Sequence, residues 1–410
     1  MSLKHLFLAG LLACLTLPAW AAPPPTSAAI DDLLRQVWES HPGIQAAQSA
    51  IDAARARSKA AGKPIYNPEL EVDAERTAVN TISVGINQTI DWGDKRDAQR
   101  QMGNSEVLVA QAELAGLRLQ VASELLTALA GYQSAQEQRQ LAMHYSELMG
   151  QLVETTEQRY AAGDLGQLDV ALAQVAYSES RMQVARREAE VARQHASLVA
   201  ASGLSLSQWP SLPSPPPAPP AEPQRDILLA RLPQLIAQQA RIANARGGIE
   251  LARASRSADP TFGLRGGAEE NDLLLGLSFS MPLNVRNNFT AEVTAASQQA
   301  VQEEKILLDL HRLAASRFDG GLSVYRLTHR AWRQWQDTGQ GNLTQQLSLV
   351  QRIWEAGELS TTNYLLQTGQ NINTQITAAE LKGDLRLAWV AWLRASGQIG
   401  AESKGEGNHE

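Results

Sequence analysis

Apolar residues recur with helical spacing over most of the chain, in a few long stretches. Between about residues 94 and 159 they return mostly at every third or fourth position, at Leu114, Leu117, Val121, Leu125, Tyr132, Leu141, Tyr145, Leu148 and Leu152. This spacing predicts one helix of about 66 residues, roughly 100 Å long. A similar pattern covers 287–353, and shorter ones cover 30–63, with a break at Pro42, and 226–258. Helices of this length predict a rod rather than a compact domain.

A shorter helix is predicted to return along the long one after a turn at Gly163. It carries two stripes at heptad spacing, Leu168, Val175, Met182, Ala189 and Ala196 in the first and Ala171, Ser178, Ala185, Ala192 and Val199 in the second. Small residues in such a seam allow helices to approach closely. We therefore expect these stripes to pack against the long helix.

Four short segments alternate between apolar and polar residues, which predicts strands. They cover 69–75, 82–87, 262–269 and 273–281. One apolar and one polar face suit a soluble sheet on a core, and they equally suit a barrel wall that faces lipid. Both interpretations stay open at this point. A membrane sheet must close, and four strands cannot close alone, so the second interpretation requires several copies of the chain.

The second half of the chain repeats the first. "NPELEVDAE" from Asn67 is echoed by "DPTFGLRGG" from Asp259, and the "x-A-G-x-L" turn at Gly163 is echoed at Gly357. Proline is dense between the halves, which predicts an extended linker. The predicted organisation is a first repeat at 22–204, a linker at 205–225, a second repeat at 226–400 and a flexible tail at 401–410. The fold class is thus mainly α, with long antiparallel helical hairpins and four strands per chain.

The first residues have the order of a signal peptide. Lys4 precedes an apolar run, and Ala19, Trp20 and Ala21 form an A-x-A cleavage site, so residues 1–21 are predicted to be removed on export. The single cysteine, Cys14, lies in a loosely lipoprotein-like context, and its acylation is the alternative. No later apolar run is long enough for a transmembrane helix.

The composition argues against several functions. A net charge of −7 gives no reason to expect nucleic acid as a partner. The histidines are scattered singly, without the spacing of a metal site, and neither a nucleophile motif nor a phosphate-binding or dinucleotide-binding loop is present. We expect no enzyme activity, no bound metal and no cofactor.

Acidic residues occupy the polar face of the first strand. They are Glu69, Glu71, Asp73 and Glu75. In a closed barrel they would line the lumen, where a ring of carboxylates favours cations. The alternative is that they only solvate the lumen.

The layout resembles the TolC-like outer-membrane efflux family over about residues 30–400. The duplication carries this resemblance, together with "NPELE" at Asn67, "DWGDKR" at Asp91, "PLNVRN" at Pro282 and the two glycine turns. The short motifs are most similar to the branch that serves heavy-metal RND pumps of the cobalt–zinc–cadmium type. The resemblance implies a homotrimer whose subunits share a twelve-stranded barrel in outer-membrane lipid and a helical tunnel in the periplasm.

The resemblance also implies a role for the two glycine turns. In the family these turns form the tunnel entrance and meet a periplasmic adaptor protein, and the residues that map onto them are Arg159, Gly163, Leu165, Gly357 and Leu359. A plainer interpretation is that each glycine only ends a helix. Channels of the family often carry an acid six residues after the turn, which is Asp169 here, whereas the second half has Asn363.

The function predicted from the sequence is a passive exit channel below an inner-membrane RND pump and its adaptor, with heavy-metal cations as cargo. An alternative is a channel for organic drugs or for type I protein secretion. An alternative of another class is an exported coiled-coil scaffold without a barrel.

Overall fold

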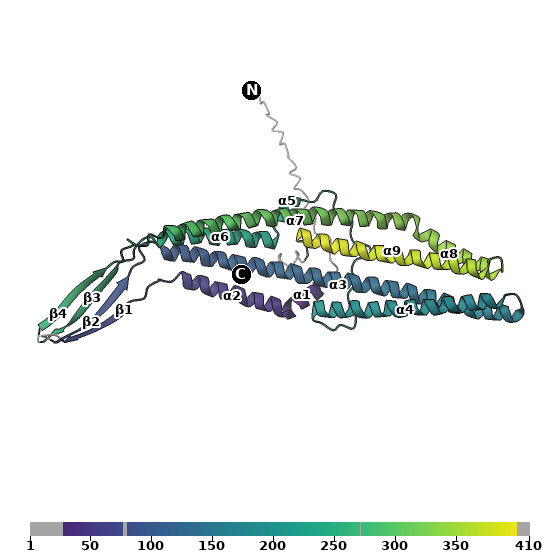
Figure 1. Cartoon of the computed structure of the whole chain (residues 1–410), viewed down its shortest axis with the longest axis horizontal. Coiled ribbons are helices and arrows are strands. Elements are labelled where there is room, and N and C mark those ends of the chain that lie inside the picture. The colour runs from purple at the N-terminus through teal and green to yellow at the C-terminus, as the bar shows by residue number, and fades with distance from the viewer. Residues whose placement is uncertain (1–27, 77–79, 271, 400–410) are drawn as a thin grey trace, which may run out of the picture.

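The chain forms a long rod of helices with a small sheet at one end (Figure 1). The computed structural model describes residues 28–76, 80–270 and 272–399. The predicted signal peptide, Cys14 and the tail at 401–410 lie outside the described residues. None of the helices within the described ranges has a stretch long and apolar enough to cross a bilayer.

Helices make up most of the rod, as the apolar spacing predicted. Their bounds are α1 (Ala28–Ser40), α2 (Pro42–Ala61), α3 (Lys95–Ala162), α4 (Gln167–Ser202), α5 (Arg225–Ala230), α6 (Pro233–Ala254), α7 (Thr290–Thr338), α8 (Gln340–Glu355) and α9 (Thr361–Ser396). The 68 residues of α3 give it a length of about 100 Å. The same order of elements occurs twice, because α1, α2, β1, β2, α3 and α4 are followed by α5, α6, β3, β4, α7, α8 and α9.

The break at Pro42 is confirmed. His41 is the N-cap of α2, and its Nδ1 atom accepts a hydrogen bond from the backbone N–H of Gly43 at 3.1 Å. Pro42 occupies the first turn, where its missing N–H costs nothing. Pro233 starts α6 in the same way.

The second long helix is interrupted, which the sequence pattern did not predict. The continuous helix expected over 287–353 is divided at Gly339 into α7 and α8. The ring of Trp335 lies against Gly339 so closely that a Cβ atom there would be 2.3 Å from it. Apolar periodicity continues across the interruption because both helices keep a face on the same neighbour, α9.

The four predicted strands form one antiparallel sheet in the order β1-β2-β3-β4. The strands are β1 (Glu69–Arg76), β2 (Asn80–Thr89), β3 (Thr261–Glu269) and β4 (Asp272–Ser280). The register places Val72 opposite Val84, Ile86 opposite Leu264 and Leu264 opposite Leu277, so apolar residues share one face. Strand β2 from the first repeat pairs directly with β3 from the second, which joins the repeats within one sheet.

The main hydrophobic core lies in the middle of the rod and draws on both repeats. Among its fully buried side chains are Leu34, Leu125, Leu129, Phe318 and Trp389. A smaller core lies towards the hairpin ends and contains Met149, Leu152, Ala173, Trp354 and Tyr364. Helix α3 contributes to both cores and contacts α2, α4, α6 and α9, whereas α7 and α8 pack on α9.

The predicted seam of α4 was wrong. Leu168, Val175 and Met182 are 71%, 67% and 58% exposed, so this stripe points away from α3. The side of α4 that is buried carries Ala173 and Ser180, which are small enough for a close approach. The second predicted stripe is exposed as well at Ala171, Ser178, Ala185 and Ala192, so neither stripe is the one that packs within the chain.

The proline-rich segment between the repeats lies along the helices. Leu212 is buried, and the Gln133 side chain donates to the carbonyl oxygen of Pro210 at 3.1 Å. Arg326 of α7 donates to the carbonyl oxygen of Pro220 at 2.8 Å. The segment therefore has fixed partners on α3 and α7 although it is not helical between residues 203 and 224.

A buried charge cluster joins α3 to α9 beside this segment. Glu137 accepts from Lys382 at 2.9 Å and from Arg386 at 2.8 Å. Burial alone would raise the pKa of Glu137, but the two hydrogen bonds and positive charges hold it below its ordinary value. The Nε and Nη1 atoms of Arg386, which is 2% exposed, have no hydrogen-bond partner among the described residues. Glu137 thus supplies the negative charge that compensates the buried guanidinium of Arg386.

Candidate functional site

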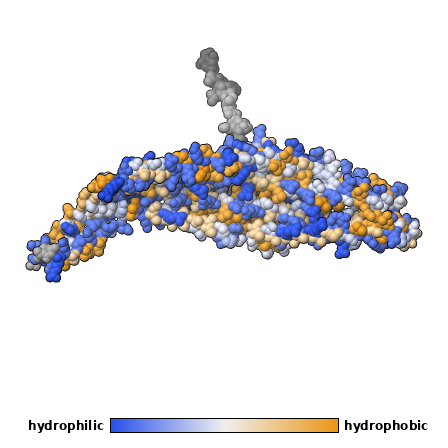
Figure 2. All heavy atoms as spheres, in the orientation of Figure 1, coloured by the Kyte–Doolittle hydropathy of each residue, from blue (hydrophilic) through white to orange (hydrophobic). Residues whose placement is uncertain are grey.

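The apolar face of the sheet is uncovered. The exposure of its side chains ranges from 46% at Phe262 to 87% at Leu277, and the face also includes Leu70, Val72, Ile82, Val84, Ile86, Leu264, Leu273, Leu275 and Phe279. The sheet projects beyond the ends of the helices, and hydrophobic residues are visible along it (Figures 1 and 2). A soluble sheet would bury such a face on a core. Within the described residues no core lies beneath it, so this face is available to lipid or to a partner.

The opposite face is polar and lined by small residues. The four predicted acids of β1 all lie on it and are exposed. Glu71 accepts from the side chain of Asn87 at 2.7 Å. Arg265 of β3 shares this face, and its side chain lies over Gly276, where a Cβ atom would be 2.8 Å from its Nε. Among the residues that the structure describes, no group of three potential ligands is placed to hold a metal ion.

The two glycine turns lie together at the other end of the rod (Figure 1). Gly163 and Gly357 have φ angles of 86° and 78°. At the first turn the N–H of Asp164 donates to the carbonyl oxygen of Arg159 at 2.9 Å. At the second turn the N–H of Glu358 donates to the carbonyl oxygen of Ile353 at 3.1 Å. Both helices end in the same left-handed glycine cap. This geometry agrees with the interpretation that each glycine ends a helix.

Arg159 connects the two hairpins at this end. Its Nη1 and Nη2 atoms donate to the carbonyl oxygens of Trp354 and Glu355 at 3.1 and 2.5 Å. Its guanidinium carbon lies 4.9 Å from the centre of the Trp354 ring, which in turn lies 4.8 Å from that of Tyr364. The last carbonyl oxygens of a helix carry partial negative charge, so a cation there is favourable.

The position six residues after each turn glycine has a role in capping. The carboxylate of Asp169 accepts from the N–H of Gly166 at 3.2 Å at the start of α4. At the start of α9 the N-cap side chain is the acceptor instead, since Ser360 Oγ accepts from the N–H of Asn363 at 3.3 Å. Each repeat thus contains one half of a capping box.

The remaining two predicted residues of the turns differ in surroundings. Leu359 is half-buried and packs on the smaller core. Leu165 is half-buried and does not belong to that core. The structure therefore brings Arg159, Gly163, Leu165, Gly357 and Leu359 to one end of the rod, and it places the four acids of β1 at the other end (Figure 1).

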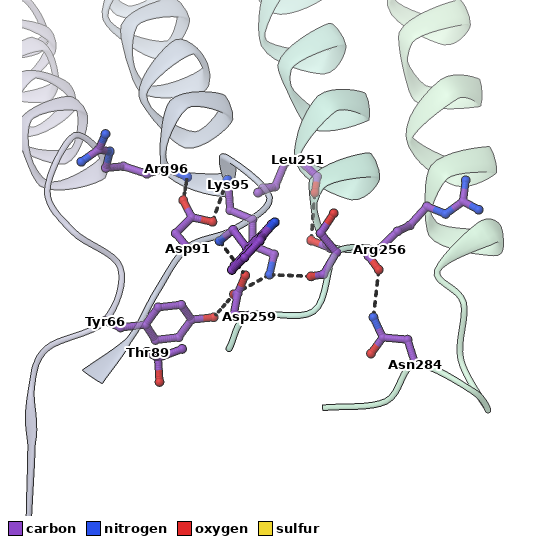
Figure 3. Close-up of polar contacts among 12 residues, drawn as sticks. Tyr66, Thr89, Asp91, Lys95, Arg96, Leu251, Arg256, Asp259 and Asn284 are labelled. Atoms are coloured by element: carbon purple, nitrogen blue, oxygen red, sulfur yellow. Dashed lines mark hydrogen bonds and ion pairs between the residues drawn. The ribbon is translucent and has the colours of Figure 1, made fainter. Parts of the chain in front are cut away.

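A polar cluster at the junction of sheet and helices was missed by the sequence analysis (Figure 3). Asp259, which is 5% exposed, accepts from Lys95 Nζ and from the hydroxyl of Tyr66, both at 2.6 Å. It also accepts from the N–H of Trp92 at 3.2 Å. Asp91 accepts from the N–H of Lys95 at 3.1 Å at the start of α3. Asp91, Trp92 and Lys95 belong to the "DWGDKR" segment and Asp259 to the "DPTFG" segment, but their pairing could not be read from either.

The cluster shifts the pKa values of its members. Burial would raise the pKa of Asp259, but hydrogen bonds from Lys95, Tyr66 and Trp92 and the charge of Lys95 hold it below its ordinary value. The hydrogen bond to Asp259, together with burial and nearby negative charge, raises the pKa of Tyr66 to about 12. The cluster consequently holds one ionised carboxylate that joins loops from both repeats.

The comparisons with known proteins agree with this geometry. Residues 33–204 match the family model for outer membrane efflux proteins. The first repeat of this chain is thus similar in sequence to the outer membrane efflux proteins. The family is one of efflux proteins, in agreement with the expectation from the sequence that the chain is not an enzyme.

A relative and two solved structures are similar to a larger part of the chain. The cobalt–zinc–cadmium resistance protein CzcC of Cupriavidus metallidurans is 24% identical over 288 residues, which is 66% of this chain and 67% of that protein. The outer-membrane channel OprN has a TM-score of 0.77 at 17% identity, with 90% of each chain covered. CusC has a TM-score of 0.74 at 16% identity, with 90% of this chain and 92% of that chain covered. The second repeat, which the family model does not cover, thus has the same fold as these channels.

Proposed function

We propose that the chain is one subunit of an outer-membrane exit channel in a tripartite efflux system, and that its cargo is a heavy-metal cation. The observation that carries the proposal is a sheet with a fully exposed apolar face and a polar, acidic opposite face. A closed barrel with lipid outside and water inside requires this arrangement.

Closure of the sheet supports a ring of copies. Strands β1 and β4 are the two edges of the sheet, and nothing pairs with their outer sides among the described residues. Lipid cannot satisfy unpaired backbone groups, so in a membrane β1 of one copy must pair with β4 of the next. Three copies would provide the twelve strands that the family resemblance implies. The contact is head-to-tail, which is the kind of contact from which closed rings are built.

The outer stripe of α4 supports the same arrangement along the rod. Leu168, Val175 and Met182 form an exposed apolar line, and the smaller core of the same chain does not use them. A neighbouring copy in the ring would cover this line and form the wall of a helical tunnel.

Two observations support a cationic cargo. CzcC is named as a cobalt–zinc–cadmium resistance protein and covers two thirds of this chain. The polar face of each copy carries four acids on β1, and one arginine, Arg265, opposes them from β3. A ring of such faces would concentrate divalent cations in the lumen without binding any of them tightly.

The hairpin ends support contact with a periplasmic adaptor, below which an RND pump would supply the energy. Glu355 and Glu358 lie in the second turn and Asp164 in the first, all of them exposed. The two turns lie at the end of the rod away from the sheet, so in a membrane-anchored ring they would point into the periplasm.

The first experiment measures the mass and the circular dichroism of the protein extracted from outer membranes in mild detergent. A trimer with mixed helix and strand signal supports the channel. A water-soluble monomer or dimer would mean that the sheet is a soluble cap, and the channel proposal would fall.

The second experiment tests the cargo. We expect a strain that lacks the protein to become sensitive to cobalt, zinc or cadmium, with unchanged sensitivity to organic drugs. In single-channel recordings under a salt gradient, neutralising Glu69, Glu71, Asp73 and Glu75 together should reduce the preference for cations, whereas Glu39→Gln on α1 should not. Sensitivity to drugs alone, or an unchanged ion preference, would contradict the metal cargo.

A further inference from the structure

The two repeats enter the sheet through equivalent segments. Asn67 and Pro68 come directly before β1, and Asp259 and Pro260 come directly before β3. The strands that follow them occupy different places, because β1 is at the edge of the sheet and β3 is in its interior.

The burial of these segments differs accordingly. Asp259 and Pro260 are buried, whereas Asn67 and Pro68 are exposed. The difference does not come from the segments themselves, which are nearly the same in sequence. It comes from the side on which each strand has its neighbour. Strand β3 has β2, and the loop that follows β2, on the side that is the open edge of the sheet in β1.

The loop from β2 to α3 covers Asp259 and Pro260. The N–H of Ile90 donates to the carbonyl oxygen of Pro260 at 2.9 Å. Trp92 and Lys95 then donate to the carboxylate of Asp259. The contact between a strand-entry segment and the exit loop of the adjacent strand is thus defined within one chain (Figure 3).

The equivalent exit loop, from β4 to α7, is held on the side of β3, where the Asn284 side chain donates to the carbonyl oxygen of Arg256 at 3.0 Å. Among the described residues, no strand-entry segment covers its outer side. It covers residues 281–289, and its apolar side chains Leu283 and Val285 are 73% and 85% exposed. In the repeated motif "PLNVRN", Arg286 stands where "DWGDKR" has Lys95. Arg286 is exposed and makes no ion pair with the described residues. One chain therefore presents an uncovered entry segment at one edge of its sheet and an uncovered exit loop at the other.

We propose that Asn67 and Pro68 of one copy dock against the β4–α7 loop of the next copy, with Arg286 of that loop donating to the side-chain oxygen of Asn67. The proposed contact between copies is the equivalent of the one within a chain, in which Lys95 of the β2–α3 loop donates to Asp259 before β3. This inference rests on the proposed ring and names the residues of its seam outside the strands.

The chemistry of the seam follows from the residue types. An amide replaces the carboxylate, so in the seam the cationic guanidinium donates to a neutral amide oxygen, whereas the interior junction has a buried ion pair. The β4–α7 loop, at 281–289, is longer than the β2–α3 connection, at 90–94. The extra residues give Leu283 and Val285 room to lie beside Asn67 of the next copy. The ring thereby contains two kinds of junction, an ion pair inside each copy and a hydrogen bond from a cation to an amide between copies.

Disulfide cross-linking in the detergent-extracted protein tests the proposal. In a Cys14→Ala background the chain has no other thiol. We expect Asn67→Cys combined with Leu283→Cys or with Val285→Cys to give covalent dimers and trimers on oxidation. Asn67→Cys combined with Glu39→Cys, on α1, should give none.

A charge variant tests the same contact without cross-linking. Asn67→Asp should form an ion pair with Arg286 and raise the temperature at which the assembly dissociates, and the added substitution Arg286→Gln should abolish the gain. If the extracted protein is a trimer by mass but shows neither cross-linking nor this gain, the seam is wrong and the channel proposal stands. A monomer in mild detergent would overturn both.

Discussion

Arg159 on α3 holds the end of α8 by donating to the carbonyl oxygen of Trp354 while lying over the ring of the same residue. One side chain thus contacts both the backbone and the aromatic ring of a residue in the other repeat. Arg159 thus joins the two hairpin ends of one chain, and its loss should destabilise both ends.

Arg159→Ala should loosen the hairpin ends. The substitution removes two hydrogen bonds to carbonyl oxygens and a cation–π contact, which together are worth about 2 kcal/mol. Hydrogen exchange of the backbone amides at 350–358 should become faster, while exchange in the middle of α3 stays unchanged.

Arg352→Ala provides the matched control for this prediction. Arg352 is exposed on α8, and its side chain makes a long hydrogen bond of 3.4 Å to the carbonyl oxygen of Ser348. If both variants accelerate exchange equally, Arg159 has no special part in holding the ends.

Asp259→Asn should destabilise the junction in a pH-dependent way. Removing the charge leaves Lys95 without its partner in a partly buried site, at a cost on the order of 3 kcal/mol. The pKa of Asp259 is lowered in the folded state, so its contribution is present above the unfolded value of about 3.9 and is lost as the pH falls through the folded pKa. Urea unfolding in detergent should show the full deficit at pH 7 and a shrinking one below about pH 4.

Tyr66→Phe tests the other side of the same cluster. The raised pKa of Tyr66 means that its contribution is present below the unfolded value of about 10 and is lost as the pH rises through about 12. The variant should lose about 1 kcal/mol at neutral pH and should lack this part of the alkaline destabilisation. An alkaline profile identical to that of the natural chain would show that Tyr66 ionises without consequence.

Glu137 and Arg386 should be strongly coupled. Glu137→Gln leaves a buried guanidinium without its charge partner and should cost about 3 kcal/mol. Arg386→Met removes the buried charge itself, so adding Glu137→Gln to it should cost much less. A double-mutant cycle from urea unfolding should give a coupling of about 1–3 kcal/mol, and additive effects would refute the pairing.

Gly163→Ala should weaken the first hairpin end through the backbone alone. No atom lies within 4 Å of the position of a Cβ there, so the cost is that of the left-handed conformation, about 1 kcal/mol. Gly163→Asn should cost less, because asparagine tolerates this region better. Thermal unfolding should rank the three chains in the order Gly, Asn, Ala, and equal stability of Ala and Asn would mean that side-chain contacts decide.

The periodic elements were predictable because their signal is local. The spacing from Leu114 to Leu152 identified α3, and the alternation in β1 and β2 identified the sheet and its acidic face. The Asp259 cluster was not predictable, because Lys95 and Tyr66 lie 164 and 193 positions away from it in the chain. The interruption at Gly339 was missed for another reason, since a glycine in a helical pattern is common and only the ring of Trp335 makes this one necessary.

On one side of the rod, α3 is a single continuous helix from Lys95 to the hairpin end. The other side has a joint at Gly339, where α7 meets α8 (Figure 1). A load applied at the hairpin ends is therefore carried along α3 to the junction beside Asp259, whereas on the second side it is taken up as bending. Because the two sides do not yield equally, an axial push at the hairpin ends should bend the rod towards the side that carries Gly339.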